Sequence, residues 1–533
     1  MDLPVLDIKN LSVSFASDAV RNISLGIAPG EILAIVGESG SGKSVTALAI
    51  MQLLSKQATV KGQVFFATKN IQVDLLSLAE DKINAIRGKD IAMIFQEPMT
   101  SLNPVLSCGE QVTEVIQLHQ RLSKKIAKQQ TIALFDKVQL PDPANIYDRY
   151  PHQLSGGQKQ RVMIAMAMSC SPSVLIADEP TTALDVTVQA AILDLIRSLQ
   201  KQMGMSVIFI THDLGVAADI ADKIVVMYKG EIVEQGAVND VLKHPKHEYT
   251  RALLDIKKDD GRRTTDHQQP TTSNQQPFLK VENLNVVYGK RSPFFKAVDE
   301  VSFDIYKGET VGLVGESGCG KTTLGRTIIQ LLKPTSGKII LDGIELTALS
   351  EKEIRPLRKN FQVIFQDPYA SLNPRMTIGK AIEEPMKVHG ILHSSAQRKE
   401  KLLQLLERTG IGASAYNKYP HQFSGGQRQR ICIARALALD PSFLVFDESV
   451  SALDMRTQAQ VLTLLDELKK EFGFTAIFIS HDLSIVHRVS DRIMVMYKGR
   501  IIETGSADEV YFSPAHPYTK RLLDAMPGKR LMG

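Results

Sequence analysis

Two stretches decide the fold of this chain: Gly37-Glu38-Ser39-Gly40-Ser41-Gly42-Lys43-Ser44 and Gly315-Glu316-Ser317-Gly318-Cys319-Gly320-Lys321-Thr322. Both read G-x-x-x-x-G-K-[ST], the pattern of a loop that cradles phosphate groups. An apolar run of buried-strand type precedes each stretch, and a helix-forming run follows it, starting at Val45 and at Thr323. A chance glycine-rich turn could explain one copy, but not two in the same strand–loop–helix context. The sequence therefore predicts nucleotide binding.

The residue types of this pattern suit a nucleotide and Mg²⁺. Glycines let the backbone approach phosphate oxygens closely, and the N-terminus of the following helix offers unpaired N–H groups and a positive dipole. Lys43 and Lys321 would reach the β- and γ-phosphates. The hydroxyl groups of Ser44 and Thr322 would ligate Mg²⁺.

Length and composition limit the class of protein. A chain of 533 residues is too long for one hydrophobic core, so several domains are expected. The net charge of +5 is mild for this length and does not favour a nucleic-acid binder. The 4 cysteines include no C-x-x-C pair, which argues against a disulfide framework or a zinc site and fits a reducing cytosol.

Neither a targeting signal nor a membrane span is expected. Residues 1–7 are acidic and lack the basic-then-apolar pattern of a signal peptide. The longest uncharged stretch, 162–177, falls short of the roughly 20 apolar residues that cross a bilayer. We interpret this stretch as the end of a buried helix, a turn and a core strand.

An internal repeat of about half the chain organises the sequence. Gln96 and Gln366 lie in matching Ile-Phe-Gln-acid-Pro stretches, and Ser155 and Ser424 lie in matching Tyr-Pro-His-Gln-x-Ser-Gly-Gly-Gln stretches. These motifs recur at a spacing of 269 or 270 residues, whereas the two phosphate loops are 278 residues apart. The first half therefore has about eight additional residues before Gln96, which we place in a surface hairpin near 68–78. The repeat indicates a duplicated domain rather than a short-period solenoid.

A polar stretch separates the two halves. Residues 259–277 are rich in Gln, Thr, Asp and Arg and have no apolar periodicity. As a coil this stretch would span about 25 Å on average, which holds the halves at a millimolar-order effective concentration. We predict one domain over 1–258, a flexible linker over 259–277 and a second domain over 278–533.

Strands and helices alternate in the last part of each half. Apolar runs of buried-strand type stand at 174–177, 207–210, 443–446 and 476–479. An early β-rich part, the phosphate loop with its helix and a middle helical section precede them. The alternation predicts the α/β class with buried parallel strands.

Acidic and histidine side chains follow these strands in both halves. Ligands bind at the carboxyl ends of parallel strands, where an Asp can hold Mg²⁺ and an adjacent Glu can act as general base on an attacking water. A histidine at the same edge could contact the γ-phosphate and orient the water, although a single strand-end histidine is more often a cap or a core residue. The residues concerned are Asp178, Glu179 and His212, and Asp447, Glu448 and His481.

Together these motifs resemble those of ATP-binding-cassette (ABC) ATPases. The family's signature, Walker B and D-loop sequences are matched by Leu154-Ser155-Gly156-Gly157-Gln158, Asp178-Glu179-Pro180 and Ala183-Leu184-Asp185. The second half matches them with Ser424-Gly425-Gly426-Gln427, Asp447-Glu448 and Ala452-Leu453-Asp454. Gln96 and Gln366 match its Q-loop, and His212 and His481 match its H-loop. The resemblance covers almost the whole chain.

The resemblance implies two tandem P-loop nucleotide-binding domains, each with a RecA-like α/β core, an antiparallel β subdomain and a helical subdomain. It implies head-to-tail pairing, with ATP on Lys43 closed over by Ser424 and Gly426, and ATP on Lys321 by Ser155 and Gly157. The implied catalytic residues are Glu179, Glu448, His212 and His481, and the implied Mg²⁺ residues are Ser44, Gln96, Asp178, Thr322, Gln366 and Asp447. The implied ATP-binding residues are Gly37, Ser39, Gly40, Gly42, Lys43, Ser44, Val45, Gln96, Ser155, Gly156, Gly157, Gln158, Gly315, Ser317, Gly318, Gly320, Lys321, Thr322, Thr323, Gln366, Ser424, Gly425, Gly426 and Gln427, with Phe15 and Tyr288 as adenine-stacking aromatics.

Finer features resemble the ATPases of bacterial peptide and nickel importers. They are the stretches 185–190, 211–214 and 226–230, and the tail His516-Pro517-Tyr518-Thr519 with its echo Glu248-Tyr249-Thr250. The fused form is similar to the ATPases of glutathione and microcin-C-type peptide importers. The resemblance implies two membrane-spanning permease subunits, an extracytoplasmic solute-binding protein and a peripheral position on the cytoplasmic face of the inner membrane. Peptides are the expected solute, with nickel or another small solute left open.

A soluble twin-cassette ATPase that acts on ribosomes or DNA is the main alternative. Such proteins usually have a long basic linker, whereas the linker here is nearly neutral. Its charged residues are Asp259, Asp260, Arg262, Arg263, Asp266 and His267. An exporter ATPase would be paired with a different membrane domain and would lack the importer-like tails. The sequence therefore favours transport and no nucleic-acid partner.

Two departures from the family pattern carry expectations. Ser449 follows Glu448 where Pro180 follows Glu179, which changes backbone stiffness but no catalytic group, so both sites are expected to hydrolyse ATP. Cys319 lies in the second phosphate loop near a helix N-terminus, which predicts a lowered thiol pKa and alkylation that impairs this site.

Three histidines near the ends of the halves could suggest a metal site. Prolines and polar residues flank them, which favours solvated loop residues instead. They are His244, His247 and His516.

Overall fold

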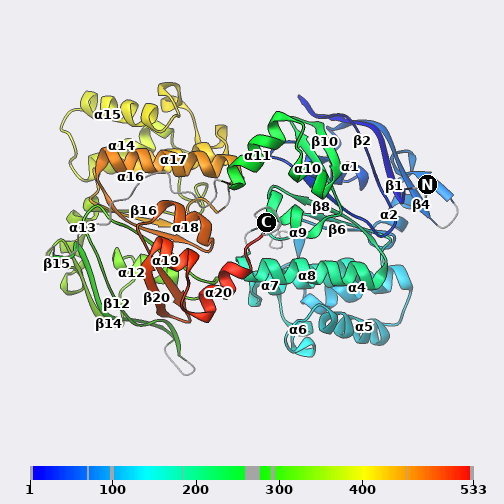
Figure 1. The fold of residues 1–533 in the computed structure, drawn as a ribbon, viewed down its shortest axis with the longest axis horizontal. Coiled ribbons are helices and arrows are strands. Elements are labelled where there is room, and N and C mark those ends of the chain that lie inside the picture. Colours follow the sequence, from blue (N-terminus) through cyan, green and yellow to red (C-terminus); the bar gives the residue numbers. More distant parts are fainter. Residues whose placement is uncertain are drawn as a thin grey trace. The chain divides into compact units, whose positions relative to one another are not determined.

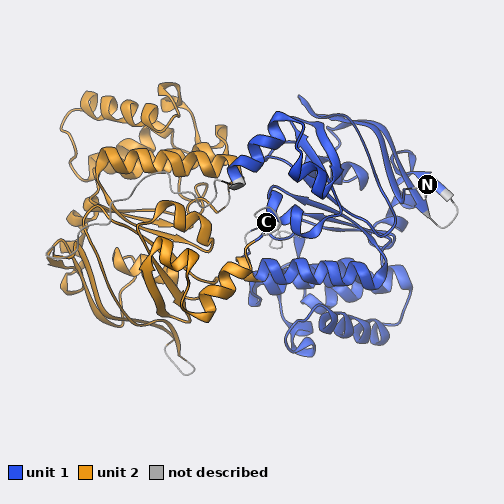
Figure 2. Cartoon of the chain, viewed as in Figure 1, with its two compact units in different colours: residues 1–184, 188–258, 527–533 blue, residues 185–187, 259–526 orange. Residues whose placement is uncertain are grey.

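The computed structural model describes residues 4–68, 71–96, 101–182, 184–258, 276–289, 294–451 and 453–528. The chain divides into two compact units: unit 1 comprises residues 1–184, 188–258 and 527–533, and unit 2 comprises 185–187 and 259–526 (Figure 2). Each unit has one antiparallel sheet, one mixed sheet and a set of helices (Figure 1). The predicted α/β class is confirmed. The domain boundaries stay a prediction, because most of the expected linker lies outside the described residues.

The mixed sheet of unit 1 has six strands in the order β10-β9-β3-β8-β7-β6. All neighbours are parallel except β9 and β10. Its central strands β3, β7 and β8 are buried along their whole length, as expected for apolar runs covered on both faces. The bounds are β3 Ile32–Val36, β6 Ile91–Ile94, β7 Val174–Asp178, β8 Ser206–Thr211, β9 Lys223–Tyr228 and β10 Glu231–Ala237.

Unit 2 repeats this sheet in the order β16-β17-β18-β13-β19-β20. Its strands β13, β17 and β18 are buried throughout and pair in parallel. All the parallel strands predicted from apolar runs are therefore present in both units. The bounds are β13 Thr310–Val314, β16 Phe361–Ile364, β17 Phe443–Asp447, β18 Thr475–Ser480, β19 Arg492–Tyr497 and β20 Arg500–Ser506.

A four-stranded antiparallel sheet begins each unit, in the orders β2-β1-β4-β5 and β12-β11-β14-β15. Strands β4 and β5 have 10 and 4 residues, whereas β14 and β15 have 6 and 2. The hairpin predicted near 68–78 is thus longer in the first half than its counterpart in the second half. The bounds are β1 Leu6–Ser14, β2 Asp18–Ile27, β4 Thr59–Thr68, β5 Ile71–Asp74, β11 Leu279–Tyr288, β12 Phe295–Ile305, β14 Ser336–Leu341 and β15 Ile344–Glu345.

The helices of unit 1 include one after the phosphate loop, a helical section between β6 and β7, and three helices at its end. The stretch predicted to be a helix end, a turn and a strand has this structure, since α7 ends at Met168 and β7 begins at Val174. The bounds are α1 Lys43–Ile50, α2 Glu80–Ile86, α4 Cys108–Gln120, α5 Lys124–Lys137, α6 Pro143–Asp148, α7 Gly156–Met168, α8 Val186–Met203, α9 Leu214–Ile220, α10 Val238–Lys243 and α11 Glu248–Lys258, with 3-10 turns at Leu75–Ser77 and Pro151–Gln153.

The helices of unit 2 follow the same order. The bounds are α12 Lys321–Ile328, α13 Glu351–Leu357, α14 Ile378–Val388, α15 Ser395–Arg408, α16 Gly425–Leu437, α17 Met455–Phe472, α18 Leu483–Val489, α19 Ala507–Phe512 and α20 Pro517–Asp524, with 3-10 turns at Leu346–Ala348, Arg358–Asn360, Ala413–Asn417 and Pro420–Gln422. Among the residues that the structure describes, no helix has both the length and the apolar character to cross a membrane.

Each mixed sheet separates two hydrophobic cores. In β3, Ile32, Ala34 and Val36 belong to the core on the side of the helical section. Leu33 and Ile35 belong to the core that joins this sheet to the antiparallel sheet. This alternation follows from the two-residue period of a strand. Burial on both faces fixes the register of the strands, so the residues just beyond their carboxyl ends occupy defined positions.

Candidate nucleotide-binding and catalytic site

The phosphate loop of each unit joins the central strand to the first helix. The helices α1 and α12 begin at Lys43 and Lys321, two residues before the predicted starts. The residue before each helix is a glycine with a left-handed backbone, φ 97° at Gly42 and φ 112° at Gly320. A Cβ atom at Gly42 would lie 2.6 Å from the backbone oxygen of Ala19, so this turn requires glycine.

The loop lysines are fixed within their own loops. Lys43 Nζ donates to the backbone oxygens of Gly37 and Glu38, both at 2.8 Å. Lys321 Nζ donates to the backbone oxygen of Gly315 at 2.7 Å and to that of Glu316 at 2.9 Å. Both lysines are buried, so each amine is held at the base of the loop that its backbone forms.

A hydroxyl group and a carboxylate meet beside each lysine. Ser44 Oγ donates to Asp178 Oδ1 at 2.9 Å, and Thr322 Oγ1 donates to Asp447 Oδ1 at 2.9 Å. The first residue of each pair lies in the helix after the loop, and the second ends a buried strand. The structure therefore brings these predicted Mg²⁺ residues together, and their oxygen atoms are the donor type that a hard divalent cation prefers.

Burial shifts the pKa of both aspartates upward. Loss of solvent raises the pKa of Asp178 to about 6, against the hydrogen bond from Ser44, and the neighbouring Glu179 raises it further. Burial also raises the pKa of Asp447, against the hydrogen bond from Thr322 and the positive charge of Arg326. A buried carboxylate of this kind is stabilised when a cation binds beside it.

The residue after each aspartate adopts an unusual backbone conformation. Glu179 has φ 45° and Glu448 has φ 49°, in the left-handed region that residues other than glycine rarely enter. Their amide groups donate to the backbone oxygens of Ile210 and Ile479, both at 3.0 Å. Such a conformation costs about 1–3 kcal/mol and is held by the surrounding structure, typically at functional sites.

Three donors converge on the carboxylate of Glu179. Gln96 Nε2 lies 3.1 Å from Glu179 Oε2, Thr182 Oγ1 donates to the same oxygen at 2.9 Å, and His212 Nδ1 lies 3.2 Å from it. The structure thus assembles Gln96, Glu179 and His212, which the sequence placed far apart. Thr182 was not predicted from the sequence. The feature that could have indicated it is a hydroxyl-bearing residue three positions after the expected base, Glu179.

The corresponding cluster of unit 2 is arranged differently around its carboxylate. Gln366 Nε2 lies 3.1 Å from Glu448 Oε2, but His481 Nδ1 is 3.8 Å away. Lys321 Nζ lies 3.9 Å from Glu448 Oε1. Ser451, the counterpart of Thr182, donates to the backbone oxygen of Glu448 at 2.9 Å.

In each unit the histidine lowers the pKa of the glutamate and the glutamate raises the pKa of the histidine, as in an ion pair. Burial alone would raise the pKa of Glu179, but the hydrogen bonds from His212 and Thr182 and the charges of His212 and Lys43 lower it to about 2. Burial alone would lower the pKa of His212, yet Glu179 raises it. The same opposition lowers the pKa of Glu448 and raises that of His481.

The signature serines begin helices. Ser155 Oγ accepts from the amide of Gln158 at 3.3 Å, and Gln158 Oε1 accepts from the amide of Ser155 at 3.0 Å. Ser424 and Gln427 form the same capping box at the start of α16, with the same distances. The glutamine side chains therefore have a local structural role, and their contact with nucleotide stays a prediction.

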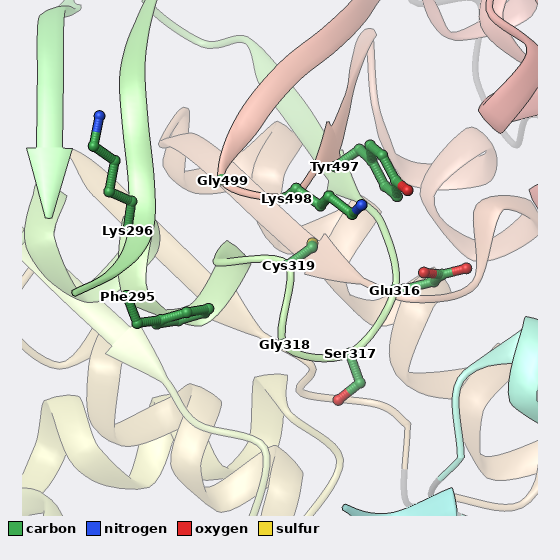
Figure 3. A pocket seen from close by; sticks show the side chains of 9 residues that line it. All are labelled: Phe295, Lys296, Glu316, Ser317, Gly318, Cys319, Tyr497, Lys498 and Gly499. Carbon is green, nitrogen blue, oxygen red and sulfur yellow. The ribbon is translucent and has the colours of Figure 1, made fainter. Parts of the chain in front are cut away.

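The two expected adenine-stacking aromatics are surface residues. Phe15 and Tyr288 have 42% and 44% of their surface exposed, so neither belongs to a core. Tyr288 pairs across its hairpin with Phe295, a residue that sequence reasoning missed. Phe295 lines a cavity of about 450 Å³ beside the second phosphate loop. In Figure 3 the ring of Phe295 points toward the loop at Gly318 and Cys319.

The expectation of a reactive thiol at Cys319 is wrong on its pKa. Burial raises the pKa of Cys319, and the charge of Lys321 opposes this only in part. The helix N-terminus therefore does not activate this thiol, because loss of solvent disfavours the thiolate more than the loop stabilises it.

Two of the three terminal histidines cap helices. His247 Nδ1 accepts from the amide of Tyr249 at 3.1 Å, and His516 Nδ1 accepts from the amide of Tyr518 at 3.1 Å. This defined role replaces the expectation of solvated loop residues for these two.

Comparisons with known proteins identify the family. A model described as "ABC transporter" matches residues 20–182 and 298–451. The chain belongs to the ABC transporter family. A second model, "Oligopeptide/dipeptide transporter, C-terminal region", matches residues 233–283 and 502–530.

Several relatives match this ABC chain over almost its full length. It is 48% identical to the glutathione import ATP-binding protein GsiA of Pectobacterium atrosepticum and 49% identical to those of Escherichia coli O157:H7 and Salmonella typhimurium, over 98% of this chain and 89% of each relative. It is also similar to a solved dimeric bacterial ABC transporter cassette, with 30% identity, a TM-score of 0.40, and coverage of 43% of this chain and 98% of that one. The predicted fused ATPase of the peptide-importer subfamily is confirmed, in preference to an ATPase of ribosomes or DNA.

Proposed function

We propose that this ABC chain powers a bacterial importer of small peptides, with a tripeptide of the glutathione type as its first candidate solute. The observation that carries the proposal is that two complete sets of ATP-site residues and two oligopeptide/dipeptide transporter C-terminal regions lie in one chain. The relatives named for glutathione import support the choice of solute.

In the proposed cycle, Lys43 and Lys321 bind the β- and γ-phosphates of ATP. Each lysine is preorganised, because its loop already fixes the amine by two hydrogen bonds. Asp178 with Ser44, and Asp447 with Thr322, would hold Mg²⁺. The cation supplies charge neutralisation on the phosphates when bound.

Glu179 and Glu448 are the proposed general bases. A carboxylate with a lowered pKa is ionised at neutral pH, so it can accept a hydrogen bond from the attacking water. Water oxygen forms the new bond to the γ-phosphorus, its proton passes to the glutamate, and ADP leaves with the bridging oxygen. His212 and His481 hold the carboxylates in place and are proposed to contact the γ-phosphate. Closure of each site by Ser155 or Ser424 of the other half stays a prediction of the family resemblance.

The proposed partners are two membrane-spanning permease subunits, reached at the cytoplasmic face of the inner membrane, and a solute-binding protein outside it. Membrane association is proposed to occur through these partners. A protein that only hydrolyses ATP would need no such partner, so partner capture and solute uptake together test the proposal.

Uptake in cells separates the proposed solute from others. A strain that lacks this chain should lose uptake of radiolabelled glutathione or di- and tripeptides, and the wild-type chain should restore it. A chain with Lys43→Ala and Lys321→Ala should not restore it, whereas Lys82→Ala, a change at an exposed lysine away from the loops, should. Mild-detergent purification should recover two polytopic membrane proteins with the chain. Recovery of ribosomal proteins, with unchanged peptide uptake, would overturn the proposal.

A further inference from the structure

The C-terminal region of each unit reaches its phosphate loop through one tyrosine. Tyr249 Oη accepts from the amide of Glu38 at 3.0 Å, and Tyr518 Oη accepts from the amide of Glu316 at 3.0 Å. The two glutamates occupy the same position in the two loops, directly after the first glycine. A tyrosine from the oligopeptide/dipeptide-type region thus bonds to the loop that holds the lysine.

Burial and ring packing hold each tyrosine in place, in addition to its hydrogen bond to the loop. Tyr249 and Tyr518 are 7% and 2% exposed. Their rings pack on Tyr228 and Tyr497, with ring centroids 4.2 Å and 4.4 Å apart. Such aromatic pairs restrict both rings in addition to burying their surface. The hydroxyl groups therefore have little freedom to leave the loop amides.

Hydrogen bonds also fix the backbone that carries each tyrosine. In unit 1, Glu234 of β10 accepts from the amides of Lys246 and His247 at 2.8 Å and 3.1 Å. His247 Nδ1 then accepts from the amide of Tyr249 at the start of α11. The segment directly before α11 is therefore hydrogen-bonded to β10, the edge strand of the sheet.

Unit 2 builds the same arrangement from other residues. Glu503 of β20 accepts from the amides of Ala515 and His516 at 2.6 Å and 3.2 Å and from the Thr519 hydroxyl. His516 Nδ1 accepts from the amide of Tyr518 at the start of α20. The arrangement thus occurs twice in the described residues, although Lys246 stands in one unit where Ala515 stands in the other.

The bonded loop residue also holds the loop lysine. The backbone oxygen of Glu38 accepts from Lys43 Nζ at 2.8 Å, and its amide donates to Tyr249. The backbone oxygen of Glu316 accepts from Lys321 Nζ at 2.9 Å, and its amide donates to Tyr518. Both backbone groups of one residue are therefore fixed, one by the tyrosine and one by the lysine that binds phosphate.

We propose that Tyr249 and Tyr518 are positioning residues that hold the phosphate loops in the conformation that binds ATP. The C-terminal region of each unit then tunes nucleotide affinity at its own loop. This inference rests on the proposed role of Lys43 and Lys321 in ATP binding. A loop released from the tyrosine would populate its binding conformation less, and apparent affinity falls by the same fraction.

The test measures binding of a fluorescent ATP analogue to the full chain, one site at a time. In a Lys321→Ala background only the loop of Lys43 binds, and Tyr249→Phe removes the acceptor while keeping the ring. We expect the Kd to rise about tenfold, because leaving the loop amide without its hydrogen-bond acceptor weakens binding by about that factor. Tyr228→Phe is the matched control: it removes a hydroxyl from the other ring of the stack and keeps the hydroxyl of Tyr249 that accepts from Glu38. Its Kd should stay within about twofold.

Further measurements distinguish positioning from general stability. In ATP hydrolysis Tyr249→Phe should raise KM more than it lowers kcat, and the thermal unfolding temperatures of Tyr249→Phe and Tyr228→Phe should be similar. His247→Ala, one step further from the loop, should raise the Kd by a smaller factor. In the Lys43→Ala background, Tyr518→Phe should reproduce the effect at the second loop. Should Tyr249→Phe fail to fold, a raised Kd in His247→Ala with unchanged unfolding would still support the inference.

Each possible negative result has a different meaning. Equal Kd values for Tyr249→Phe, Tyr228→Phe and the unmodified background would overturn the positioning role while leaving the ATP site intact. Equal increases for the two phenylalanine variants would assign the effect to ring packing and also overturn it. If a chain with both Lys43→Ala and Lys321→Ala binds the analogue as tightly as the unmodified chain, the proposed function of the lysines fails instead.

Discussion

The proposed ATP sites of unit 1 and unit 2 have the same backbone conformation but differ in the side chains around the proposed base. In both, a buried strand ends at an aspartate. The glutamate that follows has a left-handed backbone, and its amide donates a hydrogen bond of 3.0 Å to a backbone oxygen of the neighbouring strand. Thr182 bonds to the carboxylate of Glu179, whereas Ser451 turns to the backbone oxygen of Glu448. The fold determines the shared backbone conformation, whereas single side chains determine which hydrogen bonds the carboxylate receives.

The difference has a physical cause in the two hydroxyl residues. The β-branched Thr182 has restricted side-chain rotation, so its hydroxyl is directed to one partner. Ser451 lacks the methyl group, and its hydroxyl donates to the backbone oxygen of Glu448 instead. Glu448 is then left with Gln366 and with the longer ion pairs to His481 and Lys321. We therefore expect the base of unit 1 to be better positioned and its site to turn over faster.

The largest effect tests whether both glutamates are bases. Glu179→Gln and Glu448→Gln should each slow hydrolysis at their own site by about 10²–10⁴, because each loses its proton acceptor. Binding of ATP should remain near normal, since the amide keeps the size of the carboxylate. Steady-state phosphate release and equilibrium binding measure the two quantities. Glu179→Gln should remove the larger share of total activity, and normal hydrolysis by the double variant would show that neither residue is the base.

Exchange of the two hydroxyl residues tests the cause of the difference between the sites. Thr182→Ser should lower turnover at the first site by about threefold to tenfold, because a charged-group hydrogen bond of about 1.5–3 kcal/mol is only partly lost. Ser451→Thr should raise turnover at the second site. Both are measured with the other site silenced by the glutamine change. Equal rates for each pair of serine and threonine chains would mean that this contact does not control the base.

The sequence predicted the elements of this fold well, because apolar runs with defined ends specify buried strands. The apolar run before the first phosphate loop forms the buried strand β3, and Asp178 and Glu179 lie at a strand end as expected. The motif residues Gln96, Glu179 and His212 also meet, since the topology brings those strand ends together.

Contacts that depend on rotamers or distant packing were not predictable in this way. Thr182 and Ser451 differ by one methyl group, yet they choose different acceptors. The pKa of Cys319 depends on burial by the whole loop, which a helix N-terminus in the sequence does not reveal. The bond from Glu38 to Tyr249 joins residues 211 positions apart, and no local pattern indicates it.

An arginine that is present only in unit 2 predicts a smaller difference in Mg²⁺ dependence. Arg326 Nε lies 3.7 Å from Asp447 Oδ2, and Leu48 occupies the same position of α1 in unit 1. The arginine competes with a cation for the carboxylate, but its side chain is 45% exposed, so solvent screens the attraction. Arg326→Leu should lower the Mg²⁺ concentration for half-maximal activity at the second site by about twofold to threefold. Leu48→Arg should raise this Mg²⁺ concentration at the first site. Unchanged values in both variants would show that the arginine does not compete with Mg²⁺ for the aspartate.

The smallest effect concerns the loop position where unit 2 has Cys319 and unit 1 has Ser41. Both side chains are buried in their loops, so Cys319→Ser should give a second loop like the first and change ATP affinity by about twofold at most. Because burial raises the pKa of Cys319, its thiolate fraction at pH 7 is lower than that of an ordinary thiol, and alkylation should be slow. Below that pKa the thiolate fraction grows tenfold per pH unit, so the rate should rise as pH increases. Mass spectrometry after iodoacetamide treatment measures it, with the half-buried Cys170 as internal reference. Labelling of Cys319 at pH 7 as fast as that of Cys170 would show that the loop opens to solvent, and protection by ATP would then locate that opening at the nucleotide site.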